Sequence, residues 1–160
     1  MVFNVLEDLK SHLQGKIIIL GIGNTLRSDD GAGSILANRI KDKVPFIVFD
    51  VGINPENYLD KIIKERPDTI LIIDTGDFGG KPGELRVVEG KDIKTVNLFS
   101  THNTSLSLLI NYLQNNLKVD IIILIIQPKA IAFGDKLSPD IVKTIEELED
   151  WFYEAGKKKG

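Results

Sequence analysis

A chain of 160 residues, 42% of them hydrophobic, is long enough to bury about two-thirds of its unfolded surface in one core. Its 20 basic and 23 acidic residues are mixed along the sequence and give a net charge of -3, which argues against a nucleic-acid or membrane surface. The absence of cysteine excludes disulfides, thiolate zinc sites and a cysteine nucleophile, so any metal must be held by oxygen and imidazole.

The first 15 residues form an extension before the first strand. Glu7, Asp8 and Lys10 interrupt it where a secretory signal would need an unbroken apolar core, so we expect a short amphipathic helix with His12 on its surface. The most apolar run, residues 121–126, is far too short to cross a bilayer, which takes roughly 20 residues as a helix. We therefore expect one soluble, cytoplasmic domain spanning residues 1–160.

Strands and helices alternate in the next part of the chain. Residues 16–20 are a continuous apolar run, as expected of a strand covered on both faces, and residues 32–40 have the apolar spacing of a helix. Residues 46–51 are predicted as a second strand. Asn54, followed by proline and glutamate, predicts a capped helix over residues 54–64.

The following segment contains a strand that is reached through a loop alone. Residues 69–73 are predicted as the third strand, residues 76–83 are too rich in glycine for anything but a loop, and residues 85–88 resume as the fourth strand. Parallel strands need long crossover connections. The fourth strand is therefore predicted to be antiparallel to its neighbours.

The last third of the chain completes an α/β pattern. A helix is predicted after residues 101–103, a buried fifth strand at residues 121–126, and a final helix that opens at Ser138 and Pro139. Only residues 157–160 are expected to be disordered. The predicted fold class is α/β: a three-layer α/β/α domain with a five-stranded mixed sheet, one strand of which is antiparallel.

The loop at residues 21–33 contains two glycines, Gly21 and Gly23, that suggest a dinucleotide-binding fingerprint, with Asp50 as the acid for the ribose. The match fails at Leu26, where the fingerprint requires a third glycine. The ending of a phosphate-binding P-loop is also absent. Nucleotide binding is therefore the weaker interpretation of this loop.

Acids and a histidine gather where ligands bind in such sheets, at the carboxyl ends of the strands. Asp29 and Asp30 lie at the entry to a helix, a place where acids are also favoured simply by the helix dipole. Asp74 directly follows a buried strand, where an ionised carboxylate is costly unless it is paired, hydrogen-bonded or metal-bound. With His102, which precedes a helix, two carboxylates and one imidazole would make an open site for a first-row divalent ion.

The order and sequence of the loop segments resemble the hydrogenase maturation endopeptidases over nearly the whole chain. The matching segments are GIGNTLRSDDGAG, GINPEN, LIIDTGDFGGKPGELR, STHNTSLSLLI and IIQPKAIAFGDKLSP. The match favours the branch that serves formate-hydrogenlyase-like, membrane-bound hydrogenases. Two departures are the extension of about 15 residues and Val51, where relatives often carry glycine.

The resemblance implies removal of the C-terminal extension from the precursor of a [NiFe] hydrogenase large subunit after nickel insertion. It places the metal-contacting and catalytic residues at Asp30, Asp74 and His102. Asp29 is the alternative to Asp30 if the first turn of the helix is rotated, but the resemblance favours Asp30. Nickel would belong to the substrate and would not be a permanent cofactor. A scaffolding or nickel-binding protein of the same assembly pathway is the main alternative.

Overall fold

The computed structural model describes residues 2–95 and 103–159, with side chains for residues 4–94 and 106–158. One five-stranded sheet has the order β2-β1-β3-β5-β4, where the strands are β1 (Ile17–Ile22), β2 (Ile47–Gly52), β3 (Thr69–Thr75), β4 (Leu85–Glu89) and β5 (Asp120–Ile126). The first three and β5 are parallel, whereas β4 pairs antiparallel with β5. The predicted mixed sheet, including its antiparallel fourth strand, is confirmed.

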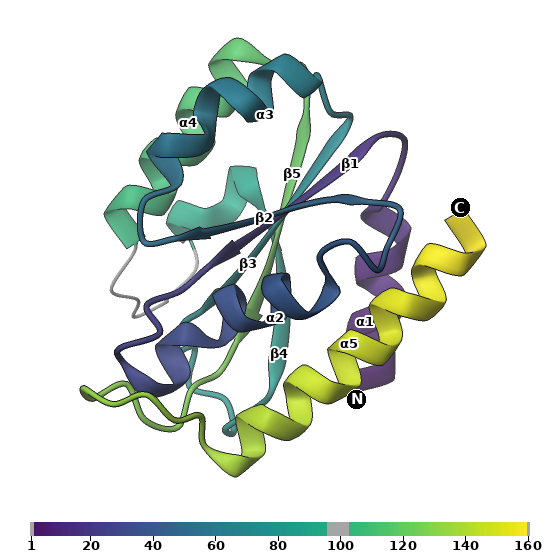
Figure 1. Cartoon of the computed structure of the whole chain (residues 1–160). Helices are drawn as coiled ribbons and strands as arrows, with labels where there is room; N and C mark the ends of the chain where they lie inside the picture. Colours follow the sequence, from purple (N-terminus) through teal and green to yellow (C-terminus); the bar gives the residue numbers. More distant parts are fainter. Residues whose placement is uncertain (1, 96–102, 160) are drawn as a thin grey trace.

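Helices cover both faces of the sheet, as Figure 1 shows. The helices α2 (Ala32–Ile40) and α5 (Pro139–Lys159) lie on one face, and α3 (Leu59–Glu65) and α4 (Asn103–Asn116) lie on the other. Alternate residues of a strand point to opposite faces. Accordingly, Ile19 packs in the core under α2 and α5, whereas Ile18 packs in the core under α3 and α4.

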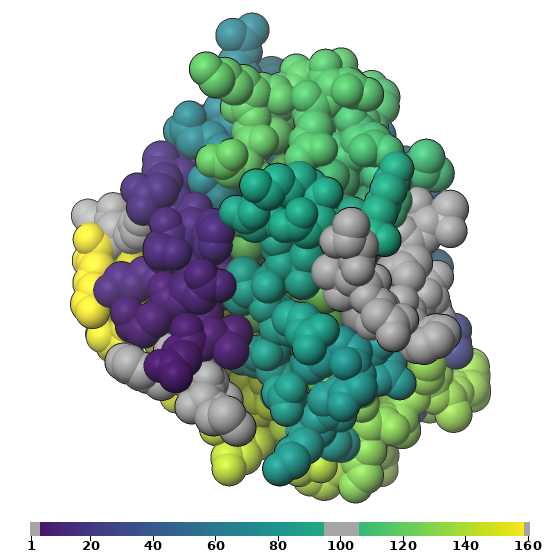
Figure 2. All heavy atoms as spheres, turned by 180° about the vertical axis from the view of Figure 1, so that it is seen from behind, coloured from purple at the N-terminus to yellow at the C-terminus, as the bar shows by residue number. Residues whose placement is uncertain are grey.

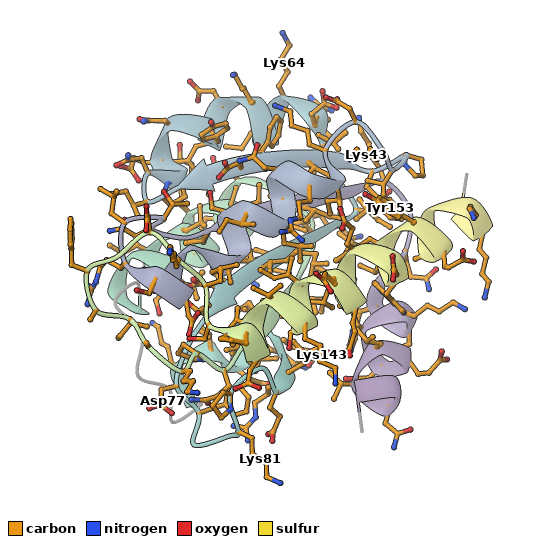
Figure 3. All side chains as sticks on the ribbon, turned by 60° about the horizontal axis from the view of Figure 1, so that its bottom comes forward. Lys43, Lys64, Asp77, Lys81, Lys143 and Tyr153 are labelled. Atoms are coloured by element: carbon orange, nitrogen blue, oxygen red, sulfur yellow. The ribbon has the colours of Figure 1, made fainter. Side chains whose placement is uncertain are left out.

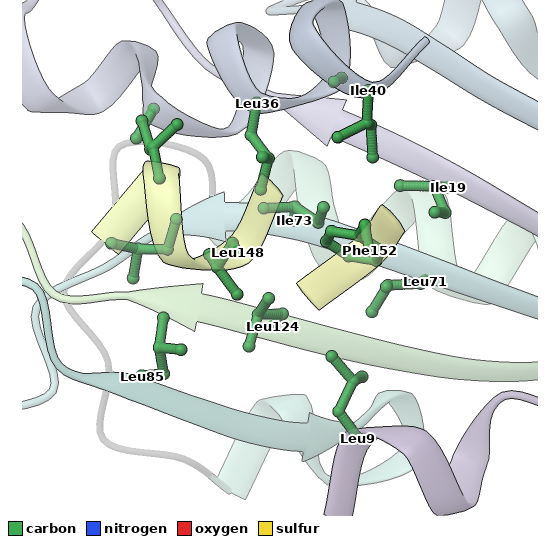
Figure 4. Packing of buried hydrophobic residues seen from close by; sticks show 14 of the residues in the cluster. Leu9, Ile19, Leu36, Ile40, Leu71, Ile73, Leu85, Leu124, Leu148 and Phe152 are labelled. Carbon is green, nitrogen blue, oxygen red and sulfur yellow. The ribbon is translucent and has the colours of Figure 1, made fainter. Parts of the chain in front are cut away.

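The core between the sheet and helices α2 and α5 is tightly filled. Leu36 of α2 and Phe152 of α5 are fully buried, and both pack over the central strands around Ile73 and Leu124 (Figure 4). A buried aromatic or branched side chain of this kind contributes about 1.5–3 kcal/mol relative to an exposed one. The site-bearing strands therefore rest on a rigid scaffold.

The N-terminal extension forms helix α1 (Val2–His12), as predicted, and packs beside β4 at the edge of the sheet (Figure 2). Leu6, Leu9 and Leu13 bury its apolar side in the core shared with α2 and α5. The predicted surface position of His12 is only partly realised, because its side chain is 25% exposed and lies 3.5 Å from Asp8. The extension thus covers part of the sheet.

Two helical predictions need correction. The segment after β2 starts with a 3-10 helix, η2 (Pro55–Tyr58), before α3, and Asn54 makes no side-chain capping bond. Helix α5 continues to Lys159, so residues 157–159 are helical where disorder was predicted. Lysines in the last turn are favoured by the helix dipole. No helix in the described part of the chain is long and apolar enough to span a bilayer.

Candidate functional site

Two predicted site residues lie at the carboxyl edge of the sheet. Asp30 belongs to the 3-10 helix η1 (Ser28–Gly31), which connects β1 to α2, and Asp74 is the next-to-last residue of β3. Because β1 and β3 are parallel neighbours, the loop after β1 starts beside the end of β3. Asp74 still pairs with Ile125 of β5, so it lies inside the strand and not after it. Strand β3 ends at Thr75, two residues beyond the end that the apolar run predicted.

A single residue, Thr75, connects the two carboxylates. Its hydroxyl donates a hydrogen bond of 3.1 Å to Oδ1 of Asp30, and its backbone N–H donates one of 2.8 Å to Oδ1 of Asp74. Both acids are therefore fixed relative to the end of β3. This arrangement restricts their side-chain freedom before any ligand binds.

Both carboxylates are more buried than an open site would require. Asp30 is 3% exposed and Asp74 is 2% exposed, whereas the sequence interpretation expected donors that face solvent. The extra strand residues explain part of the difference, because they keep Asp74 paired with Ile125 of β5. A buried carboxylate is costly unless hydrogen bonds or a cation compensate its charge.

The third predicted ligand, His102, lies outside the described residues. Helix α4, which follows it, begins at Asn103 and leads back to the start of β5 at the opposite edge of the sheet. Across the residues that the structure does describe, no three histidine or acidic side chains converge as a metal site would require. The set of Asp30, Asp74 and His102 therefore stays a prediction.

Asp29, the predicted alternative to Asp30, is a structural anchor. It is fully buried, and its Oδ2 accepts hydrogen bonds from the backbone N–H groups of Lys129 (3.0 Å) and Ala130 (2.9 Å). Ser138 adds its backbone N–H to Oδ1 at 2.6 Å and its hydroxyl to Oδ2 at 2.8 Å. Four donors occupy this carboxylate, which disfavours it as a metal ligand.

The glycines of this loop allow close packing. A Cβ on Gly21, one of the two that suggested a nucleotide site, would lie 2.4 Å from the backbone oxygen of Gly33 in α2. A Cβ on Gly33 would lie 2.3 Å from the backbone oxygen of Ile22 and 2.5 Å from that of Ile73. Helix α2 can therefore approach β1 and β3 only through a glycine. Asp50, the candidate ribose acid, accepts hydrogen bonds from the side chains of Ser34 and Asn38 in that helix, which gives it a structural role.

Gln127, which directly follows β5, holds the glycine-rich loop at residues 76–83. Its Oε1 accepts hydrogen bonds from the N–H groups of Phe78 (2.9 Å) and Gly80 (3.1 Å), and its Nε2 donates to Asp77 at 3.0 Å. The pKa of Asp77 is lowered mainly by the hydrogen bond from the N–H of Gly79 and, to a smaller extent, by the hydrogen bond from Gln127, because both stabilise the charged carboxylate. Figure 3 shows Asp77 and Lys81 at the outer end of this loop.

Sequence reasoning missed Gln127. The available signal was a polar residue directly after a wholly apolar strand, which is the same signal that identified Asp74. The loop that follows the candidate acid is thus a fixed feature of the site, even though its sequence is rich in glycine.

Comparison with known proteins gives one consistent family. Residues 31–154 match the HycI family of hydrogenase maturation proteases, so Asp30 lies immediately before the matched range. The hydrogenase 3 maturation protease of Escherichia coli K12 is 36% identical over 140 residues, which cover 84% of this chain and 89% of the relative. A putative hydrogenase maturation protease of Methanocaldococcus jannaschii is 32% identical over 154 residues, covering 84% of this chain and 90% of the relative.

A solved structure supports the same assignment. The crystal structure of the [NiFe] hydrogenase maturation protease HycI from Thermococcus kodakarensis KOD1 superposes with a TM-score of 0.84 at 31% identity. The superposition covers 94% of this chain and 99% of that one.

Proposed function

The chain belongs to the hydrogenase maturation protease family, and on that premise we propose that it removes the C-terminal extension from the nickel-loaded large subunit of a [NiFe] hydrogenase. It is a peptidase by its family. The finer proposal is that Asp30, Asp74 and His102 recognise the nickel that the precursor carries. The observation that supports it best is the pair of carboxylates joined through Thr75 at the carboxyl edge of the sheet.

The chemistry of this ligand set favours a metal supplied by the substrate. Two carboxylates and one imidazole are an incomplete set that is unlike the sulfur-rich sites which hold late first-row ions tightly. A precursor that presents nickel on thiolates would add the missing donors. Complete coordination would then be reached only in the complex of enzyme and precursor, so that an unloaded precursor lacks the recognised feature.

Two roles for the ion are consistent with hydrolysis. The ion can polarise the scissile carbonyl or a water molecule. Alternatively, it only positions the tail, and Asp30 or Asp74 acts as the general base that takes a proton from the attacking water. In both, water adds across one peptide bond, giving a new carboxylate on the subunit and a free amine on the released tail.

A parallel incubation tests the proposal. The enzyme is added to nickel-loaded precursor and to metal-free precursor with chelator, and the intact mass of each product is measured. We expect the mass of the tail to be lost only from the nickel-loaded sample. Equal trimming of both would show that nickel is not recognised, and binding without any trimming would favour a scaffolding role.

A further inference from the structure

Three large apolar side chains protrude from two adjacent loops beside the candidate site. Phe133 is 87% exposed, Leu26 is 59% exposed and Ile131 is 39% exposed. Two hydrogen bonds join the loops. The N–H of Gly134 donates to the carbonyl oxygen of Leu26 at 2.8 Å, and Nε of Arg27 donates to the carbonyl oxygen of Ile131 at 3.1 Å. We call Leu26, Ile131 and Phe133 the apolar ridge. Contiguous exposed apolar groups mark interaction sites, whereas single exposed apolar side chains are ordinary.

The ridge is held firmly although it stands on loops. Ser28 has a positive φ of 52°. Its N–H donates to the carbonyl oxygen of Gly134 at 2.8 Å, and its hydroxyl donates to the carbonyl oxygen of Ala132 at 2.8 Å. Asp29 fastens the same loop through its four hydrogen bonds. A surface that is already ordered loses little conformational entropy on binding. Figure 1 shows this loop, between β5 and α5, protruding beside the start of α2.

We propose that the apolar ridge is the docking surface for the folded body of the large-subunit precursor, next to the tail that is cut. This inference rests on the proposed function. Its basis is continuity with the site, because Leu26 and Asp30 belong to one short loop and Asp29 ties that loop to the segment that carries Phe133. A protease that cuts only a loaded, folded precursor must contact more of it than its tail.

The ridge fits this partner better than it fits a second copy of the chain. A copy seated on the loop that carries Leu26 and Asp30 would cover the edge of the sheet where the substrate must enter. The body of the precursor, in contrast, has to lie at this edge whenever its tail is held there. An exposed aromatic residue with apolar neighbours is also typical of the few residues that dominate the energy of a protein interface.

The matched control for the ridge is Leu108. It is 65% exposed, similar to Leu26, but it belongs to α4 on the opposite face of the sheet. Serine substitutions at Phe133, Leu26 and Leu108 all shorten an exposed apolar side chain, so each variant should keep its fold. Thermal unfolding of the three variants checks this before their activity is compared.

Steady-state processing of nickel-loaded precursor and direct binding of that precursor are both measured. Phe133→Ser should raise KM and weaken binding by about tenfold or more, with kcat unchanged, because hot-spot residues reach this size. Leu26→Ser should act in the same direction, and Leu108→Ser should change neither quantity. Unchanged binding in Phe133→Ser, or an equal loss in Leu108→Ser, would overturn the inference.

Two further results separate the alternatives. Wild-type enzyme that binds the precursor but never cuts it would refute the proposed function, while the comparison of binding would still decide the role of the ridge. Sedimentation of the enzyme alone shows whether it dimerises. A dimer that Phe133→Ser converts to monomer would assign the ridge to self-association and overturn docking of the precursor.

Discussion

The hydroxyl of Thr75 donates a 3.1 Å hydrogen bond to Asp30, so the end of β3 orients a carboxylate that comes from the loop after β1. Because the backbone of Thr75 also donates to Asp74, one residue aligns both acids. The first strand and the third strand thus contribute to the candidate site as a unit. A substitution at Thr75 should therefore affect function even though both acids are retained.

Thr75→Val removes that hydroxyl while keeping the branched shape of the side chain. A buried carboxylate that loses a donor costs about 1–3 kcal/mol, so we expect a lower free energy of unfolding by an amount in this range. Processing should fall by roughly tenfold, since an error in the position of a catalytic group of this kind is expensive. Urea unfolding and precursor mass spectrometry measure the two effects. Thr75→Ser, which retains the hydroxyl, should restore both.

The predicted ligand residues should be needed for processing but not for folding. Asp74→Asn keeps the size of the side chain and loses the charge that would pair with the cation, and His102→Ala removes one donor. We expect each variant to leave nickel-loaded precursor uncut while its circular dichroism spectrum stays that of the wild type. A His102→Ala variant that cuts at the wild-type rate would remove His102 from the site.

Asp29 should act on stability first. Asp29→Asn removes a charge that accepts four hydrogen bonds and turns an amide group toward their donors, for which we expect a loss of about 3 kcal/mol in the free energy of unfolding. Asp135→Asn, an exposed change in the loop that Asp29 fastens, is the control and should cost little. Equal stabilities of the two variants in urea would contradict the anchoring role.

The positions of Asp30 and Asp74 at the sheet edge were predictable, but the burial of their side chains was not. The alternation of strands and helices predicted the sheet, and the loop before residue 85 predicted the antiparallel direction of β4. The apolar run at residues 69–73 could not indicate that β3 continues for two more residues, because pairing with β5 extends it. That extension contributes to the burial of Asp74.

Contacts between distant parts of the chain also escaped the sequence. Asp29 was recognisable as an acid at a helix entry, but its donors lie about 100 residues away, where no local pattern indicates them. Gly33 was taken as part of a loop motif, and only the geometry shows that it faces backbone atoms of two strands. The local sequence therefore predicted where Asp29 and Gly33 lie, whereas their structural roles depend on tertiary contacts.

Gly33→Ala tests whether this glycine serves packing. The added Cβ would meet two backbone oxygens at 2.3 and 2.5 Å, so α2 would have to move away from the sheet. We expect a destabilisation of about 1–3 kcal/mol or more, as for other overpacked cores, measured by urea unfolding. Gly134→Ala is the control, because its Cβ would meet mainly the hydroxyl of Ser28 at 3.0 Å, which can rotate. A Gly33→Ala variant as stable as the wild type would show that this glycine is not needed for packing.

The charge of Asp77 should persist to lower pH than that of an ordinary aspartate. In the folded protein the pKa of this carboxyl lies below its ordinary value of 3.8. The larger cause is the hydrogen bond from the N–H of Gly79, and the smaller one is the hydrogen bond from Gln127. Its contribution to stability is therefore present above the unfolded pKa and is lost as the pH falls through the lower, folded pKa. Titration of the carboxyl carbon by NMR should give a midpoint below 3.8.

Gln127→Ala should raise that midpoint only part of the way toward 3.8, because the hydrogen bond from Gly79 is the larger cause and does not depend on the glutamine. The same variant leaves the N–H groups of Phe78 and Gly80 without their acceptor, so hydrogen exchange at these two amides should accelerate. If the midpoint stays in place and exchange is unchanged, Gln127 does not hold the loop that follows the candidate acid.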